Sequence, residues 1–292
     1  MFSDKVREIK FDRTNGASKI ARNALDVLRF FVQNHKNSTH KEFVAEFREL
    51  GRRLVEARPN MAPVQNLVAQ IVYEVSTLEK KDLIFAQEFA LSRLDKLHKE
   101  SETAVKKCAE LAATIIHDSD CLATCSYSST VCETFKVAKR QGKRFKVFVA
   151  ESKTDDNMFC YGQDTATFLK SIGVPVDVFP DTKIYRFAPL TDYVLVGVDS
   201  VLCDGSIING SPTCELALKA NECGIPFYSV CETAKANTLS YLGKNVELKK
   251  GFDLVPSDLV TKIMTETGPL EANEIVEVMK EKSKFFEEFH IP

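Results

Sequence analysis

The chain of 292 residues is long enough for one large or two modest domains, and its 44% hydrophobic content is sufficient for a buried core. Its 39 basic and 41 acidic residues give a formal net charge of −2, so bulk charge gives no argument for a nucleic-acid or membrane partner. No apolar run reaches 18 residues and the N-terminus is charged throughout. We therefore expect a soluble, cytoplasmic protein without a signal peptide.

The first third of the sequence predicts helices. Apolar residues recur at helical spacing over residues 20–31, 43–54 and 64–78, and a longer helical segment follows from about residue 82 to 116. No run of β-branched residues interrupts this stretch. The sequence therefore predicts a helical N-terminal domain over residues 1–116.

From His117 onward, short apolar runs alternate with helical segments. Strands that are apolar on both faces and alternate with helices are typical of a parallel sheet covered on each side. This pattern predicts a Rossmann-like, doubly wound α/β domain over residues 117–292. No GxGxxG motif follows any strand, so we expect no dinucleotide. We expect no cofactor of another kind either. The expected strands are "CLAT" (121–124), "FKVFVA" (145–150), "VPVDVF" (174–179), "YVLVGV" (193–198) and "IPFYSVC" (225–231).

Polar clusters follow four of these strands: "SYSST" (126–130), "ESKT" (151–154), "DSVLCDGSIINGSPT" (199–213) and "CETAK" (231–235). Ligands of open α/β sheets bind at the carboxyl ends of the strands, near a topological switch point. Hydroxyls and helix N-termini gathered at one edge make an anion site. N-capping is the alternative explanation for Ser128, Ser129 and Thr213, which all precede helices. Four clusters at one edge favour a ligand.

A second anion-binding element is expected near the N-terminus. The stretch "NGASKIA" places Gly16, Ala17 and Ser18 at the start of a helix, where free amides and the helix dipole attract an anion. Arg13 adds positive charge. The alternative is an ordinary N-cap formed by Asn15 or Ser18.

Two further cations are candidate phosphate ligands. Arg58 directly precedes Pro59, which restricts its backbone at a helix break near the domain junction. Lys235 in "CETAK" is either a surface lysine or a second phosphate ligand.

The nine cysteines show no CxxC pair. Cys121, Cys125 and Cys132 come closest to a cluster, but a zinc site requires a second close pair, and no histidine lies beside them. We therefore interpret the cysteines as free, mostly buried thiols and expect no metal site.

Long stretches of the sequence resemble a known family. "CSYSSTVCETFKVAKRQGKRFKVFVAESK", "YVLVGVDSVLCDGSIINGSPT" and "IPFYSVCETAKAN" are similar to the translation initiation factor 2B regulatory subunits. They are equally similar to the isomerase relatives of those subunits, ribose-1,5-bisphosphate isomerase and methylthioribose-1-phosphate isomerase. "NGASKIARNAL", "ARPN" and "GFDLVPSDLVTKIMTETG" resemble terminal signatures of the family. The resemblance covers about Thr14 to Gly268 and implies a helical domain on a Rossmann-like domain, in a homodimer or hexamer.

The resemblance also implies a chemistry. The family's enzymes open the ring of an aldose 1-phosphate and move the carbonyl from C1 to C2, which requires an acid and a group that transfers protons. A cysteine after the first strand and an aspartate after a later strand take these parts. Asp199 in "GVDS" matches the aspartate, although an aspartate at a strand end can also cap or turn.

The cysteine position is less clear from the sequence. Alignment on "SYSST" places Ser126 there, whereas a shift of one residue places Cys125 there. A thiol with a pKa near 8.5 is readily tuned toward neutrality, but an alkyl hydroxyl needs an adjacent base.

Two other positions depart from the isomerase pattern. The family's Asn-Lys-Ile-Gly-Thr reads "NGSPT" here, so Asn209 is retained and Gly210 replaces a lysine. The family's Glu-Ser-Arg-Pro reads "ESKT" here, so Lys153 replaces the arginine. A lysine offers a point charge, whereas an arginine can donate two parallel hydrogen bonds to a phosphate. Together with Ser128, Asn209 and Lys153 are predicted to contact the sugar phosphate. These changes suggest a substrate other than ribose 1,5-bisphosphate, or a site that only binds.

Two functions therefore stay open. The first is an aldose–ketose isomerase that uses Asp199 with Ser126 or Cys125. The second is a non-catalytic regulatory subunit that senses a phosphorylated metabolite. Asp199 favours the first, whereas Ser126 and the missing lysine favour the second. A structural protein with a vestigial site is a third, weaker interpretation.

Overall fold

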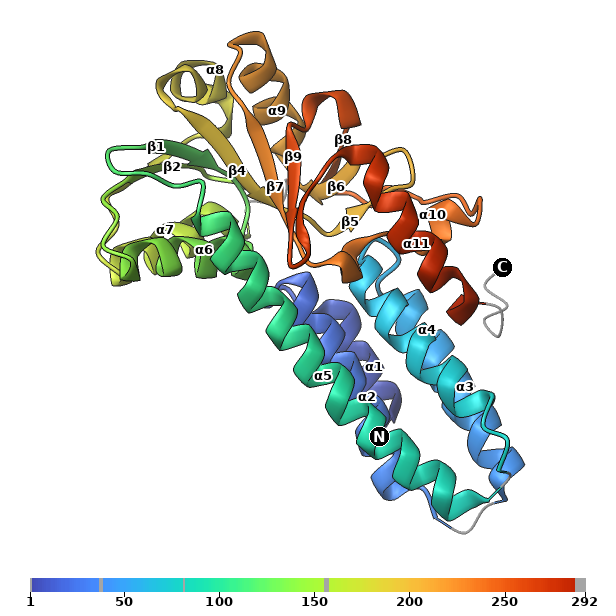
Figure 1. The fold of residues 1–292 in the computed structure, drawn as a ribbon. Helices are drawn as coiled ribbons and strands as arrows, with labels where there is room; N and C mark the ends of the chain where they lie inside the picture. The colour runs from blue at the N-terminus through green and yellow to red at the C-terminus, as the bar shows by residue number, and fades with distance from the viewer. Residues whose placement is uncertain (1, 37–38, 81, 155–157, 287–292) are drawn as a thin grey trace.

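A computed structural model describes residues 2–36, 39–80, 82–154 and 158–286 of the chain. An elongated helical bundle is joined at one end to an α/β part built on a mostly parallel sheet (Figure 1). The predicted α/β class is therefore confirmed. The bundle helices are α1 (Phe2–Phe11), α2 (Ala17–Asn34), α3 (His40–Ala57), α4 (Ala62–Ser76) and α5 (Leu83–Ala113).

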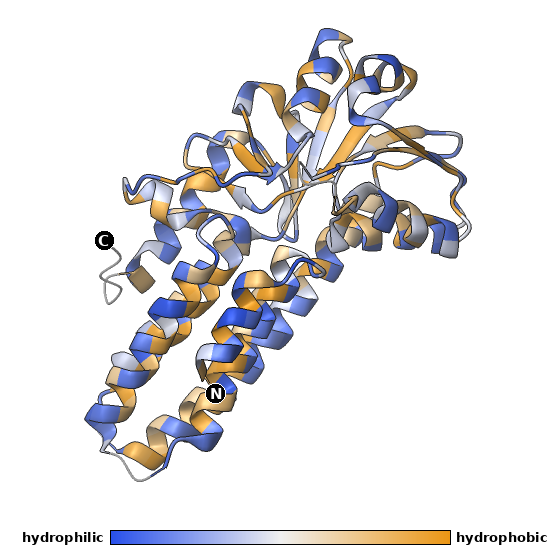
Figure 2. Cartoon of the chain, turned by 180° about the vertical axis from the view of Figure 1, so that it is seen from behind, coloured by the Kyte–Doolittle hydropathy of each residue, from blue (hydrophilic) through white to orange (hydrophobic). Residues whose placement is uncertain are grey.

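The predicted apolar stripes form the core of the bundle. Ile20, Leu28 and Phe31 of α2 are almost completely buried, as are Phe43 and Phe47 of α3. Seen from behind, apolar residues run along the helices and concentrate in the central strands (Figure 2). Helices in proteins gain most of their stability when they pack an apolar face against neighbouring elements. The burial of these stripes therefore explains why the helices form a bundle.

Helix α1 was missed by the sequence analysis. It is strongly charged, and only Val6 and Ile9 are buried in it. Two buried residues in ten give too weak a helical period to be detected from the sequence.

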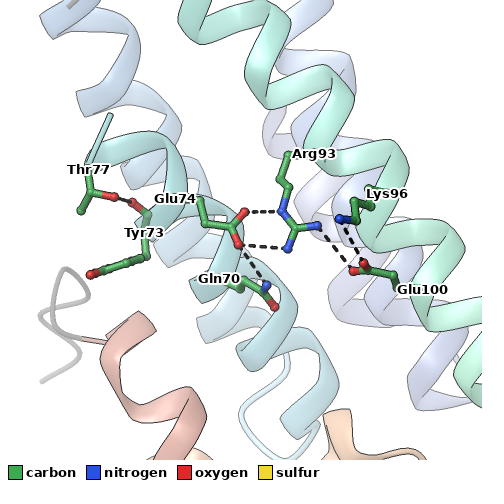
Figure 3. Close-up of polar contacts among 7 residues, drawn as sticks. All are labelled: Gln70, Tyr73, Glu74, Thr77, Arg93, Lys96 and Glu100. Atoms are coloured by element: carbon green, nitrogen blue, oxygen red, sulfur yellow. Dashed lines mark hydrogen bonds and ion pairs between the residues drawn. The ribbon is translucent and has the colours of Figure 1, made fainter. Parts of the chain in front are cut away.

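A polar clamp joins α4 to α5 on the outer side of the bundle (Figure 3). Arg93 Nε donates to Glu74 Oε2 at 2.6 Å, and Arg93 Nη2 donates to Glu74 Oε1 at 3.0 Å. Gln70 donates a further hydrogen bond to Glu74. Both charged side chains are only about one-fifth exposed, so this bidentate pair is better shielded than an ordinary surface ion pair.

The main sheet has the strand order β10-β9-β7-β4-β1-β2-β3 among the described residues. All neighbours pair in parallel except β10, which is antiparallel to β9. The chain builds outward from β1 through β2 to β3 and then returns to the other side of β1 with β4. The switch point therefore lies between β1 and β4. The strands are β1 (Cys121–Thr124), β2 (Lys146–Ala150), β3 (Val176–Phe179), β4 (Tyr193–Gly197), β7 (Phe227–Val230), β9 (Lys262–Thr265) and β10 (Gly268–Leu270).

Helices cover both faces of this sheet, as predicted. One face packs against the end of α5 with α6 and α7, and the other packs against α8, α9 and α11. Along β2, Val147 and Val149 face the first layer while Phe148 and Ala150 face the second. The α/β helices are α6 (Ser129–Arg140), α7 (Tyr161–Ser171), α8 (Ile184–Phe187), α9 (Thr213–Glu222), α10 (Thr238–Tyr241) and α11 (Ile275–Ser283). The 3₁₀ helices are η1 (Asp181–Lys183), η2 (Ala188–Leu190), η3 (Thr233–Lys235), η4 (Ser257–Leu259), η5 (Ala272–Glu274) and η6 (Lys284–Phe286).

A second, antiparallel sheet was not predicted. It consists of β5 (Ser200–Val201), β6 (Ile207–Gly210) and β8 (Phe252–Val255), with β6 in the middle. Strands of two to four residues inside a polar segment give no alternating pattern to detect. This sheet brings the segment before β8 beside the end of β6.

The division at residue 116 stays a prediction. Helix α5 passes from the bundle onto the sheet, and Phe286 near the C-terminus packs into the bundle core. None of the described helices combines the length and apolarity needed to cross a membrane.

Candidate functional site

A pocket of about 530 Å³ opens at the carboxyl edge of the sheet, where β1 and β4 meet at the switch point. The parallel register brings the segments after β1, β2 and β4 to this edge, as the sequence predicted. Seven of the predicted site residues line the pocket, whereas Ser18, Cys125, Ser128, Asn209 and Lys235 do not. The seven are Arg13, Gly16, Ala17, Arg58, Ser126, Lys153 and Asp199.

Ser126 stands at the turn where the chain leaves β1. Its φ of +60° is uncommon for a residue other than glycine. Two hydrogen bonds hold this turn: Ser126 N donates to Ser152 Oγ at 2.6 Å, and Thr165 Oγ1 donates to Ser126 O at 2.7 Å. The loops after β1 and β2 are thus fixed to each other, with the Ser126 side chain in the pocket.

Gly210 at the end of β6 lies against Ser126. A Cβ built on Gly210 would lie 2.6 Å from Ser126 Oγ. Real Cβ atoms do not approach other heavy atoms so closely, so a side chain at position 210 would require the Ser126 hydroxyl to rotate away. The absence of a lysine at position 210 is therefore sterically linked to the conformation of Ser126.

Cys125 points away from the pocket into the core between the sheet and α9. Its side chain is buried, and its Sγ lies 3.2 Å from Thr213 Oγ1. The Thr213 hydroxyl donates to Gly210 O, so the Cys125 thiol acts as the donor to Thr213. Burial raises the pKa of Cys125 to about 12. The structure thus places Ser126, and not Cys125, in the wall of the pocket.

Asp199 follows β4 and lines the pocket from the other side of the switch point. Its backbone N–H donates to Ile208 O at 2.8 Å, which fixes it to the small sheet. Burial raises the pKa of Asp199 to about 6, although the positive charges of Lys235 and Arg58 favour the ionised form. A carboxyl group with this pKa exchanges protons near neutral pH.

Helix α2 starts at the pocket without a side-chain cap. Its N-cap residue is Gly16, and Ala17 and Ser18 are buried in the first turn. Asn15 donates to Asp12 Oδ2 instead, and Ser18 Oγ has no hydrogen-bond partner among the described residues. The alternative that Asn15 or Ser18 caps this helix is therefore wrong, because the loop directs Asn15 back to Asp12.

Arg58 binds the end of α1 and the loop that follows it, and Arg13 lies in that loop. Arg58 Nε donates to Ile9 O at 2.7 Å, and its Nη2 donates to Asp12 O. Burial lowers the pKa of Arg58, despite the carboxylates of Asp12 and Asp199. Arg13 is exposed and lies over the ring of Phe159 at 5.1 Å. Arg58 thus holds the loop that carries Arg13 to the pocket.

Ser128 and Asn209 have structural partners. Ser128 Oγ accepts from Val131 N and caps α6, so capping explains this serine. Asn209 is buried and donates to Thr213 Oγ1 at 3.0 Å. Lys153, in contrast, is an exposed cation at the pocket whose backbone N–H donates to Asp181.

Lys235 is not a surface lysine, because only 3% of it is exposed. Burial alone would lower the pKa of Lys235, but the carboxylates of Glu232 and Asp199 outweigh it and raise that pKa. Glu232 is 1% exposed, and neither of its carboxylate oxygens has a hydrogen-bond partner among the described residues. These two residues form a buried pair of opposite charges in and beside η3, behind Asp199.

Sequence reasoning missed several residues of the pocket wall, among them the polar residues Tyr127, Ser152, Tyr161 and Lys250. Tyr127 and Ser152 lie inside clusters that the sequence analysis had singled out. Tyr161 begins α7, and Lys250 precedes β8, which was not predicted. No local pattern pointed to these last two residues.

All nine cysteines are free, and four of them are buried. Among the described residues, no group of three or more His, Cys, Asp or Glu side chains is arranged to hold a metal ion.

Residues 13–251 match the Initiation factor 2 subunit family. The chain belongs to this family. A putative translation initiation factor eIF-2B subunit 2-like protein of Pyrococcus furiosus is 30% identical over 276 residues, which span 90% of this chain and 94% of the relative. Ribose 1,5-bisphosphate isomerase of Methanocaldococcus jannaschii is 25% identical over 289 residues, which span 92% and 91%.

Solved structures of family members share the fold. The crystal structure of the Pyrococcus horikoshii OT3 translation initiation factor eIF-2B aligns with a TM-score of 0.82 and 26% identity, over 94% of this chain and 98% of that one. A chain of the tetrameric eIF2B-beta2-delta2 complex from C. thermophilum aligns with a TM-score of 0.81 over 96% and 94%. Its identity of 18% supports the fold alone.

Proposed function

We propose that the chain binds a sugar phosphate in the switch-point pocket and converts an aldose 1-phosphate into the ketose 1-phosphate through Asp199. The observation that carries this proposal is a carboxyl group with a pKa of about 6, lining a pocket that also contains Arg13, Arg58, Lys153 and Lys250. Cations bind phosphate, and a carboxyl group that titrates near neutrality can both donate and accept a proton. Similarity to ribose 1,5-bisphosphate isomerases supports the same reaction class.

The reaction requires the net transfer of one hydrogen from C2 to C1 and of one proton from O2 to the ring oxygen. The ring oxygen gains a proton as the ring opens, and the hydrogen on C2 is transferred to C1 while the O2 hydroxyl loses its proton to give the ketone. Asp199, part protonated near pH 6, is suited to both directions of proton transfer. Ser126 contributes a neutral hydroxyl that orients the sugar, because an alkyl hydroxyl ionises too weakly to act as the acid. The uncapped N-terminus of α2 contributes backbone N–H groups for the phosphate.

A second function is favoured by one specific observation. None of the described residues of the pocket wall is a cysteine, and the nearby Cys125 thiol is buried in the core. A pocket wall with cations but without a thiol suits a regulatory subunit that senses a phosphorylated metabolite. Similarity to the eIF-2B subunit 2-like proteins fits this alternative.

The deciding experiment is phosphorus and proton NMR of the purified protein with ribose 1,5-bisphosphate and a panel of aldose 1-phosphates. New ketose signals would support the isomerase. Line broadening of a sugar phosphate without product would support the sensor. If no ligand signal broadened or changed at millimolar concentration, both functions would be rejected.

The resemblance also leads us to expect a homodimer or hexamer in the cytoplasm. The mass in solution should then be two or six times 32.7 kDa. Size-exclusion chromatography with light scattering measures it, and a mass of one chain at micromolar concentration would contradict the expectation.

A further inference from the structure

Lys250 lies in the wall of the switch-point pocket, on the segment that leads into β8. The antiparallel pairing of β6 with β8 fixes its place. Gly210 is opposite Phe252, and Ser211 N donates to Gly251 O at 3.0 Å. Lys250 is therefore held beside the end of β6, next to the position where the sequence pattern lacks a lysine.

Position 210 carries no cation in this chain. A Cβ there would lie 2.6 Å from Ser126 Oγ, so a side chain at position 210 would require the Ser126 hydroxyl to rotate. Lys250, on the segment that enters the neighbouring strand, lines the same pocket without that contact.

The charges around the pocket come from several segments of the chain. The carboxylate of Asp12 accepts hydrogen bonds from Thr14 and Asn15, and the guanidinium of Arg58 donates to two backbone carbonyls. Much of the charge at the α2 end therefore serves the loop. Lys153 and Lys250 are exposed lysines that line the pocket. Lys153 lies on the loop after β2, and Lys250 lies on the segment before β8.

We propose that Lys250 binds an anionic group of the ligand and takes the place of the lysine that is missing at position 210. The proposal deepens the proposed function, since it rests on this pocket as a sugar-phosphate site. It makes Lys250 a specificity-determining residue, which favours ligands with a phosphate or other acidic group on the β6–β8 side of the pocket.

The chain offers a matched control. Lys249 is the next residue and is also exposed, but its Nζ lies 2.5 Å from Glu247 Oε2 and it does not line the pocket. Loss of a general surface charge would affect Lys249→Ala and Lys250→Ala alike, whereas loss of a ligand contact would affect only Lys250→Ala.

The test is isothermal titration calorimetry of the full chain and of Lys250→Ala, Lys250→Arg and Lys249→Ala, with ribose 1,5-bisphosphate and ribose 5-phosphate at fixed low salt. Lys250→Ala should weaken binding of ribose 1,5-bisphosphate about tenfold or more, because a charge-assisted contact is lost. Lys250→Arg should retain most of the affinity, and Lys249→Ala should stay within about twofold. Equal affinities of Lys250→Ala and the parent would overturn the inference.

Inorganic pyrophosphate separates this inference from the proposed function. If the parent binds pyrophosphate but neither sugar phosphate, the sugar-phosphate proposal fails. The role of Lys250 then stands if Lys250→Ala alone weakens pyrophosphate binding, and it falls if all variants bind equally. If the parent binds none of the three ligands, the pocket is no anion site and the inference is rejected. Circular dichroism of each variant establishes that it is folded.

Discussion

The Arg93–Glu74 clamp of the bundle and the charged groups in and behind the pocket wall differ in how many hydrogen bonds their charges make. In the clamp, two hydrogen bonds join the guanidinium to the carboxylate, and Gln70 donates a third. Behind the pocket, Glu232 is more deeply buried but has no hydrogen-bond partner among the described residues, and in the pocket wall Asp199 has a raised pKa. Buried charged groups without hydrogen-bond partners lower stability, and proteins tolerate this loss mainly at functional sites. The difference between the two regions therefore indicates that the pocket is the functional site.

The same contrast is present in the backbone. The helix α3 near the far end of the bundle starts with a complete capping box formed by Thr39 and Glu42. The helix α2, which starts at the pocket, has no side-chain cap. The first backbone N–H groups of α3 are thus capped by a side chain, whereas those of α2 have no side-chain cap among the described residues.

The largest expected effect comes from removing the charge of Asp199. The substitution Asp199→Asn keeps the shape of the side chain but removes proton transfer, so turnover of an aldose 1-phosphate should fall about 10²–10⁴-fold. Binding of the same ligand should change little. Asp177→Asn, which alters an exposed ion pair with Lys146 at the sheet edge, is the control and should leave turnover unchanged. Turnover by Asp199→Asn at the parental rate would remove Asp199 from the mechanism.

The same substitution should also alter stability in a pH-dependent way. Burial raises the pKa of Asp199 to about 6, so the folded state holds this proton more tightly than the unfolded state. Ionisation of Asp199 therefore destabilises the fold, with no cost below about pH 4 and the full cost above the folded-state pKa of about 6. Asp199→Asn should raise the free energy of unfolding by about 1–3 kcal/mol at pH 8 and by much less at pH 4.5. Urea unfolding at the two pH values measures this, and an equal change at both would refute the buried ionisation.

Breaking the Arg93–Glu74 clamp should lower the stability of the fold. Arg93→Ala leaves a partly buried Glu74 without its cation, so the free energy of unfolding should fall by about 1–3 kcal/mol. Ligand affinity should not change. Lys96→Ala is the matched control on the same helix, since Lys96 makes only an exposed contact of 3.9 Å with Glu100, and it should cost at most about 0.5 kcal/mol. Equal losses from the two variants would show that the bidentate geometry has no special weight.

The smallest expected effect distinguishes Ser126 from Cys125, the two residues that follow β1. Ser126→Ala removes a hydroxyl from the pocket wall and should weaken sugar-phosphate binding about tenfold or less. Cys125→Ala changes only a buried core position and should leave affinity unchanged, with a modest loss of stability. Calorimetric titration of both variants provides the comparison. A larger loss of affinity in Cys125→Ala would reverse the assignment.

The sequence predicted the edge of the sheet well, because parallel strands carry the residues that follow them to one place. Ser126, Lys153 and Asp199 come together for this reason alone. Cys125 and Ser126 lie just beyond β1, where the turn at Ser126 leaves Cys125 in the core and Ser126 in the pocket wall.

Other features depended on contacts that no local pattern encodes. Lys235 is buried because Glu232 and Asp199 compensate its charge, and both lie near it only in the folded chain. Lys250 reaches the pocket through β8, a strand in a second sheet that was itself unpredicted. Long-range pairing of this kind becomes visible only in the structure.

The central claim is that Asp199 transfers a proton on a sugar phosphate held in this pocket. The most direct measurement is proton NMR of ribose 1,5-bisphosphate incubated with the protein in D₂O, with and without Asp199→Asn. The account predicts loss of the C2 hydrogen signal with the parent and none with the variant. A C2 signal that persists with the parent under conditions where the ligand is bound, or that is lost equally with both proteins, would contradict it.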